Sequence, residues 1–223
     1  MDIVEILQIF TLVTGVIYMV MQIFQHRLMW YVDLLTLAGA VAMALLYRQD
    51  GVWAPLWAQV ALNSYFIIMA VMGIFRWRTI KNVAAAHKIH VVVMDRKIKF
   101  VALGIILAAT PAIWKLLSIT NDPYPVLDAI SFSFSIIAAW WLTRSHIEEW
   151  IAWIIADSFV VAMYALGGYW WMMALYIAYM ISSVIGYIYW KKNGHVMHAD
   201  EAARRENELR LKRLPAENGA SES

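Results

Sequence analysis

The chain has 223 residues, of which 62% are hydrophobic and only 15% charged, whereas soluble domains carry about 25% charged residues. It contains no cysteine, which excludes disulfides, a thiolate nucleophile and cysteine-based metal sites. The net charge is +2, and no basic region is interleaved with aromatic residues, so the composition argues against nucleic-acid binding.

Apolar runs of about 18 to 24 residues follow one another along the chain, and each can cross the hydrocarbon core of a bilayer as an α-helix. Polar turn sequences such as Arg48-Gln49-Asp50-Gly51 separate them. The first run is too long for a signal-peptide core. The sequence predicts seven membrane-spanning helices at about residues 4–25, 29–48, 52–75, 98–118, 124–143, 148–166 and 168–190. We expect an all-α integral membrane domain over residues 1–190 and a charged tail over residues 191–223 that begins as a helix.

Basic residues gather in every second connecting segment. The longest of these, residues 76–99, is rich in Lys and Arg and has Asp95 as its single acid. Arg27, Arg144 and the tail from Lys191 onward add to the same side of the membrane. Because cytoplasmic loops carry the positive excess, we expect the N-terminus outside and the C-terminus in the cytoplasm, in the plasma (inner) membrane. Contact with membrane lipid follows from this placement.

A weak repeat relates the two ends of the membrane domain. Trp30 and Val41-Ala42-Met43 stand 120 positions before Trp150 and Val161-Ala162-Met163, and the segment 73–77 resembles the segment 186–190. Chance similarity in an apolar, Trp-rich chain is the alternative. A real repeat pairs three helices (about 4–75) with three more (about 124–190) around a linker helix (about 98–118), which makes the repeats parallel. Such an architecture is typical of transporters, with the site near the midplane.

Polar side chains inside a predicted span indicate a candidate site, because an ionised group there costs about 2.5–3.5 kcal/mol. Trp150, Trp153 and Asp157 share one face of the sixth predicted helix. Two indoles and a carboxylate can hold a flat aromatic cation. Alternatively, the tryptophans belong to the interfacial belt and Asp157 bonds a neighbouring helix.

Further candidates for substrate binding lie in other spans, and for each a structural role is the alternative. They are Asn63, Gln59 and Tyr65 in the third span, Tyr176 and Tyr179 in the seventh, and Asp33 in the second. Asp128 is expected at the membrane interface, and Lys115 is expected to be structural.

Sequence signatures of catalysis are missing. The pairs His87/His90 and His195/His198 have no third ligand nearby, and no metalloprotease, nucleophile-elbow or Walker A motif occurs. An intramembrane enzyme using Asp33 and Asp157 as an acid pair would lack an activated nucleophile. We predict no catalytic residue, no metal and no cofactor.

The segment from Glu149 to Asp157, E-W-I-A-W-I-I-A-D, resembles the W-x-x-W-x-x-x-[N/D] signature of the PnuC-type vitamin transporters. The stretches 29–32, 63–65 and 73–77 match the family's first-half motifs in the same order. The resemblance implies a fold similar in plan to the SWEET sugar facilitators and a homotrimer. It also implies facilitated diffusion of a B-vitamin precursor, usually nicotinamide riboside, followed by trapping through a cytoplasmic kinase for NAD biosynthesis. Trp150, Trp153 and Asp157 match the family's substrate-stacking and polar positions.

Two positions depart from the riboside pattern of this family. Asn63 stands where many members have Gln, and Asp157 where Asn is common. A carboxylate suits a cation, and nicotinamide riboside and thiamine are both cations, so thiamine or another B-vitamin or nucleoside stays open as the substrate. A second alternative is a non-transporting receptor or scaffold whose basic loop binds anionic lipid or a partner.

Overall fold

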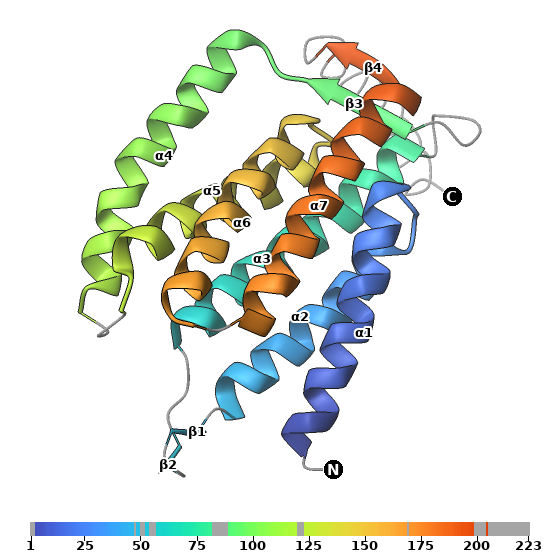
Figure 1. Cartoon of the computed structure of the whole chain (residues 1–223). Coiled ribbons are helices and arrows are strands. Elements are labelled where there is room, and N and C mark those ends of the chain that lie inside the picture. Colours follow the sequence, from blue (N-terminus) through green and yellow to red (C-terminus); the bar gives the residue numbers. More distant parts are fainter. Residues whose placement is uncertain are drawn as a thin grey trace, which may run out of the picture.

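Seven α-helices form the body of the molecule, as the computed structural model shows for the described residues 3–46, 48–49, 52–53, 57–81, 89–119, 123–168, 170–198 and 204 (Figure 1). The helices are α1 (Ile3–Ile23), α2 (Met29–Leu46), α3 (Trp57–Lys81), α4 (Arg96–Leu117), α5 (Pro125–Thr143), α6 (Glu148–Leu166) and α7 (Trp170–Asn193). Each is long and apolar enough to cross a membrane. The prediction of seven spans is confirmed.

Short strands account for two differences from the predicted spans. Strands β1 (Arg48–Gln49) and β2 (Val52–Trp53) form an antiparallel pair, so α3 begins later than predicted, since its apolar start belongs to this hairpin. Helix α7 runs on to Asn193 and is followed by β4 (Gly194–His198). The described part of the tail begins as a helix over residues 191–193, as predicted, and then becomes a strand, because the segment 194–198 pairs with a distant strand.

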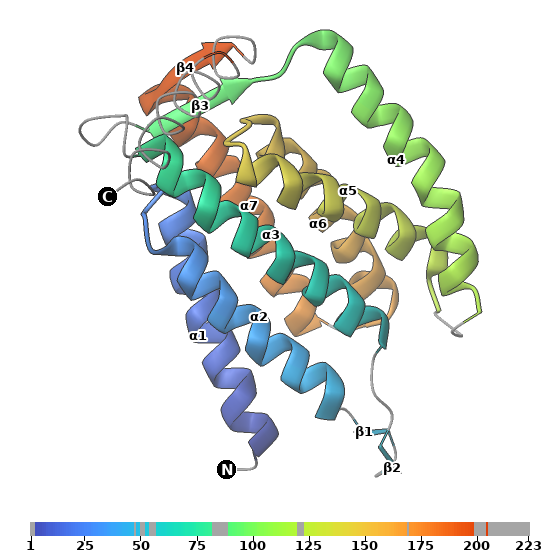
Figure 2. The same cartoon turned by 180° about the vertical axis from the view of Figure 1, so that it is seen from behind.

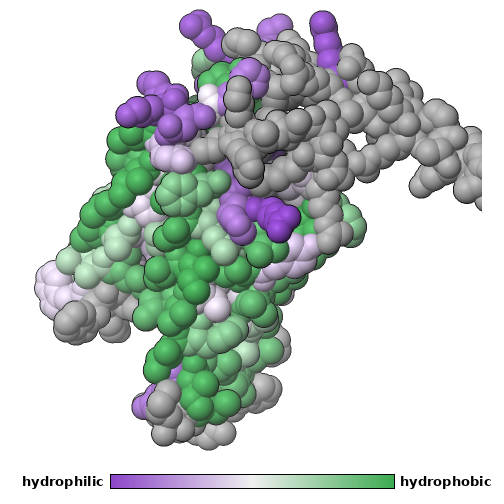
Figure 3. All heavy atoms as spheres, turned by 90° about the vertical axis from the view of Figure 1, so that its right-hand side faces the viewer, coloured by the Kyte–Doolittle hydropathy of each residue, from purple (hydrophilic) through white to green (hydrophobic). Residues whose placement is uncertain are grey.

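The helices pack as two groups of three with α4 outside them. Helices α1–α3 pack in sequence, as do α5–α7, and contacts of α3 with α5 and of α1 with α7 join the groups (Figure 2). Helix α4 packs mainly on α5, where the Thr110 hydroxyl donates to Ser133 Oγ at 3.0 Å. On the face shown in Figure 3, hydrophobic side chains cover much of the helices, and hydrophilic ones gather mainly at the end of the bundle where β4 lies. This surface fits lipid contact around the helices.

Strand β3 (Ile89–Val93) crosses one end of the bundle. It pairs with β4 in parallel, and it also bonds the α5–α6 turn, where Val92 N donates to Ser145 O at 2.9 Å and Ile147 N to Val92 O at 3.1 Å. Glu148 Oε1 accepts a bond from Met94 N at 3.2 Å and forms an ion pair with Lys99 Nζ at 2.7 Å. These contacts tie the α3–α4 connection to α6 and α7. Hereafter this is the β3–β4 end, and the opposite one is the N-terminal end.

Matching turns and tryptophan pairs recur in the two groups. Gln25 and Ser145, 120 positions apart, both have positive φ, at 47° and 56°, and the residue after each is a histidine. The rings of Trp30 and Trp77 meet edge to face at 5.4 Å and 85°, and those of Trp150 and Trp190 at 5.3 Å and 89°. These correspondences support the repeat hypothesis. The full SWEET-like plan stays a prediction.

Glycine makes each tryptophan pair possible. A Cβ atom at Gly73 would overlap the Trp30 ring, and one at Gly186 would overlap the Trp150 ring. The two glycines stand four residues before Trp77 and Trp190, which places each on the same helix face as the second ring of its pair. Trp30, Trp150 and Trp190 are among the most buried side chains described. The motif 73–77 and its counterpart 186–190 therefore have a packing role.

Candidate substrate-binding site

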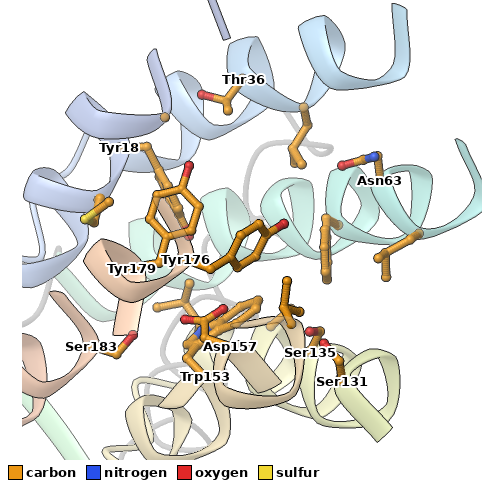
Figure 4. A pocket seen from close by; sticks show the side chains of 18 of the residues that line it. Tyr18, Thr36, Asn63, Ser131, Ser135, Trp153, Asp157, Tyr176, Tyr179 and Ser183 are labelled. Carbon is orange, nitrogen blue, oxygen red and sulfur yellow. The ribbon is translucent and has the colours of Figure 1, made fainter. Parts of the chain in front are cut away.

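A cavity of about 360 Å³ lies between the two groups of helices and is lined by residues of α1, α2, α3, α5, α6 and α7. Figure 4 shows side chains from these helices converging on it. Eight of the nine predicted site residues line it, namely Asp33, Gln59, Asn63, Trp150, Trp153, Asp157, Tyr176 and Tyr179. The size is in the range of small-molecule sites.

The α6 wall presents the predicted aromatic and acidic group. Trp150, Trp153 and Asp157 all face the cavity, and the Trp153 ring meets Phe66 of α3 at 6.2 Å. Asp157 is buried, with 7% of its surface exposed. No ion pair joins its carboxylate to another residue of the described part of the chain. A buried, unneutralised carboxylate favours a cationic ligand.

Tyrosines of α6 and α7 continue this aromatic lining toward the N-terminal end. The ring centroids of Tyr164 and Tyr176 lie 5.5 Å apart, and those of Tyr176 and Tyr179 also 5.5 Å apart. In Figure 4, Tyr176 and Tyr179 project into the space between the α1–α2 side and Asp157. The rings can stack on a planar ligand bound beside Asp157.

Helix α3 contributes two amides but not its predicted tyrosine. Asn63 Nδ2 donates to Gln59 O at 2.8 Å, so the Asn63 side-chain oxygen stays available to a ligand. Tyr65 is absent from the cavity lining, and its hydroxyl donates to Ile136 O of α5 at 2.9 Å. Tyr65 thus links the two groups of helices.

The α1–α2 wall is more polar than the sequence analysis foresaw. Asp33 is only 9% exposed and lines the cavity. Tyr18, Gln22 and Thr36 lie on the same wall. Sequence reasoning missed Tyr18 and Gln22, although their spacing of four residues within an apolar helix is a usable signal.

Other lining residues were also missed or assigned elsewhere. Asp128, expected at the interface, lines the cavity near its N-terminal end. Polar hydroxyls come from Ser131, Ser135, Ser182 and Ser183. Asp33, Asp128 and Asp157 are the acids of the lining, and none of the lining residues described is Lys, Arg or His. The described lining is therefore acidic in composition.

The β3–β4 end of the bundle is closed by packing. Trp190 Nε1 donates to Ile23 O at 2.9 Å, and Val91 of β3 is fully buried in a cluster with both tryptophan pairs. Glu149 is fully buried and lies close enough to Gln22 and Tyr18 to interact electrostatically with them. In the adjoining turn, burial lowers the pKa of His146 to about 4.

The histidine pairs give no metal site in the described residues. His87 lies outside them, while His90 and His195 are register partners in the β3–β4 ladder. The described residues contain no group of three His, Cys, Asp or Glu able to hold a metal ion.

Comparison with known proteins decides the family. The sequence profile of the nicotinamide mononucleotide transporter family matches residues 5–192. The chain belongs to this family. A similar solved structure, the crystal structure of the vitamin B3 transporter PnuC, superposes with a TM-score of 0.65 and 18% sequence identity over 83% of this chain and 80% of that chain. No curated protein sequence matches the chain significantly.

Members of the nicotinamide mononucleotide transporter family are PnuC-type transporters, so this chain is an integral, multi-pass transport protein and not an enzyme. The likeness to the vitamin B3 transporter extends over most of both chains and supports the seven-helix fold. The cavity between the two helix groups is enclosed by helices of both groups and is large enough for a small molecule.

Proposed function

We propose that this transporter takes up nicotinamide riboside by facilitated diffusion, with phosphorylation by a cytoplasmic kinase trapping the product for NAD biosynthesis. The proposal rests on the combination of Trp150 and Trp153 with the buried Asp157 in one cavity. Among the residues described, acids line this cavity and no basic side chain does.

The chemistry of the cavity fits a planar cation. The pyridinium ring of nicotinamide riboside is flat and positively charged, and an indole face attracts such a ring with about 0.5–2 kcal/mol. Asp157 would balance the charge, and the attraction between the two charges would offset part of the cost of burying them. Asn63 and Gln59 offer amide groups to the carboxamide of the ligand.

The riboside suits this lining better than the mononucleotide. A phosphate monoester carries a charge of about −1.5 to −2 at neutral pH and is normally bound by Arg, Lys or helix N-termini. Asp33, Asp128 and Asp157 would repel it. The family description names the mononucleotide, but the side chains of this cavity favour the form without phosphate.

The transport mode and orientation belong to the same proposal. The two helix groups would rock about the cavity and expose it alternately, with the N-terminus outside, the C-terminus in the cytoplasm of the inner membrane, and a trimer as the assembly. No sequence motif for ATP hydrolysis accompanies the fold. Uptake that collapses with the proton gradient, yet persists without a trapping kinase, would replace facilitated diffusion with proton-coupled symport.

Thiamine is the alternative ligand, because its cationic ring suits Asp157 equally well. Quenching of tryptophan fluorescence in the purified protein decides between the candidates when it is titrated with nicotinamide riboside, nicotinamide mononucleotide, thiamine and riboflavin. The proposal expects saturable, micromolar-or-tighter quenching by the riboside that is lost in Trp153→Ala and Asp157→Ala. Saturable binding of thiamine alone would change the substrate, and binding of none would favour the receptor or scaffold interpretation.

A further inference from the structure

We infer that Asp33 is a specificity residue that recognises the sugar of a ribosylated cation by accepting hydrogen bonds from its two adjacent hydroxyls. The inference rests on the proposed function, because it assumes that the cavity binds a pyridinium nucleoside. It assigns the ring of this ligand to one wall of the cavity and the sugar to the other.

The two walls of the cavity differ in chemistry. The α6–α7 wall is aromatic, with Trp153, Tyr176 and Tyr179 beside Asp157, whereas the α1–α2 wall carries Asp33 together with Tyr18, Gln22 and Thr36. Figure 4 shows Tyr18 and Thr36 across the cavity from Asp157 and Trp153. An aromatic wall with a carboxylate suits the charged ring, and a wall of hydrogen-bonding groups suits hydroxyls.

Asp33 is the acid among the polar residues of this wall, and a carboxylate is a stronger acceptor than an amide or a hydroxyl. The Thr36 hydroxyl donates to Val32 O at 3.1 Å, which uses its only proton. Asp33 has two carboxylate oxygens and is only 9% exposed, so bulk water solvates it poorly. Two adjacent hydroxyls can satisfy both oxygens in a bidentate manner, as other paired donors do with carboxylates.

The matched tryptophans place the two carboxylates at different depths. Trp30 and Trp150 occupy equivalent places, and Asp33 follows the first by three residues while Asp157 follows the second by seven. The difference of four residues corresponds to about 6 Å along the helix direction. Asp33 therefore lies nearer the β3–β4 end, across the cavity from Asp157. A ligand bound at Asp157 by its ring would extend its sugar toward Asp33.

A comparison of two ligands tests this division. Nicotinamide riboside and 1-methylnicotinamide share the cationic pyridinium ring, but the second carries a methyl group on the ring nitrogen in place of the sugar. Their affinities would be measured by tryptophan quenching for the unmodified protein, Asp33→Asn and Asp157→Asn. Loss of a charge-assisted hydrogen-bonded pair weakens binding about 10- to 100-fold. We expect Asp33→Asn to weaken the binding of the riboside by this factor and the binding of 1-methylnicotinamide less than twofold. Asp157→Asn should weaken the binding of both.

Controls separate the outcomes. Glu5→Gln alters an exposed acid of α1 that does not line the cavity, and it should leave both affinities unchanged. A 2′,3′-dideoxy riboside gives a second ligand without the hydroxyl pair, and it should bind equally to the unmodified protein and Asp33→Asn. If Asp33→Asn lowered the affinity for both pyridinium ligands equally, or lowered neither affinity, the inference would be overturned while the proposed function would stand. Absence of riboside binding to the unmodified protein would overturn both.

Discussion

The two groups of three helices share a scaffold but differ in what they present to the cavity. Each has a left-handed residue in its first turn, at Gln25 and Ser145, and an edge-to-face tryptophan pair over a glycine. At equivalent positions, however, α2 carries Asp33 and Leu37 where α6 carries Trp153 and Asp157. The difference teaches that the packing motifs recur while the cavity chemistry is specific to each half.

The surroundings of the halves differ as well. Helix α1 is mostly exposed, whereas α5 is mostly buried because α3, α4 and α6 pack around it. The α5–α6 turn also bonds strand β3. The second half is therefore the more firmly held of the two, and it carries the aromatic wall.

The largest effect is expected when Asp157 of α6 is replaced by the residue that stands at the equivalent position of α2. Asp157→Leu introduces the leucine that α2 has at position 37. The substitution removes from the cavity the carboxylate that would balance the charge of the ligand. We expect the affinity for nicotinamide riboside to fall about 100-fold or more, since a charge-assisted interaction and its electrostatic field are both lost. Tryptophan quenching measures it. An unchanged affinity would mean that the second half does not supply the cation site.

Much of this comparison could be predicted from the sequence. Hydropathy fixes the seven spans because lipid requires about 20 apolar residues each, and the separation of 120 positions identified Trp30 and Trp150 as counterparts. Strand β4 could not be predicted, because its stability comes from pairing with the distant β3. Tyr65 was expected in the site but bonds Ile136 instead, since a polar group in a span serves packing or binding equally well by sequence. Tyr18 and Gln22 were missed for the same reason.

The glycines test whether the packing motifs are equivalent. Gly73→Ala and Gly186→Ala each force a Cβ atom into a tryptophan ring, and we expect each to lower the free energy of unfolding by about 1–3 kcal/mol. Thermal unfolding in detergent measures the effect. Gly104→Ala is the matched control, because a Cβ atom there meets nothing within 4 Å. If Gly73→Ala lowered the stability and Gly186→Ala left it unchanged, the two packing motifs would not be equivalent.

The stability of the protein should depend on pH through His146, which follows the left-handed Ser145. Burial lowers the pKa of His146 from 6.5 to about 4, so the unfolded state binds more protons between these values. The free energy of unfolding should therefore fall as pH drops from about 6.5 toward 4, by roughly 1–3 kcal/mol. His146→Gln should flatten this slope. His26→Gln is the control because His26 is exposed, and equal slopes for both variants would contradict the prediction.

The smallest effect is expected at the ion pair between Lys99 of α4 and Glu148 of α6, which links α4 to the second half. Lys99 is 44% exposed and Glu148 is 9% exposed, so solvent screens much of their attraction. We expect Lys99→Met to lower the free energy of unfolding by less than about 1 kcal/mol, with a weaker dependence on salt than the unmodified protein shows. A loss of several kcal/mol would contradict this prediction, because an ion pair this exposed to solvent should not contribute so much to the stability.

Substrate counterflow in proteoliposomes tests the central claim most directly. Vesicles preloaded with unlabelled nicotinamide riboside, without ATP or a proton gradient, should transiently accumulate the labelled riboside from outside, and vesicles containing Asp157→Ala should not. Accumulation that depends on a proton gradient, or its absence in vesicles whose protein still binds the riboside, would contradict transport by facilitated diffusion.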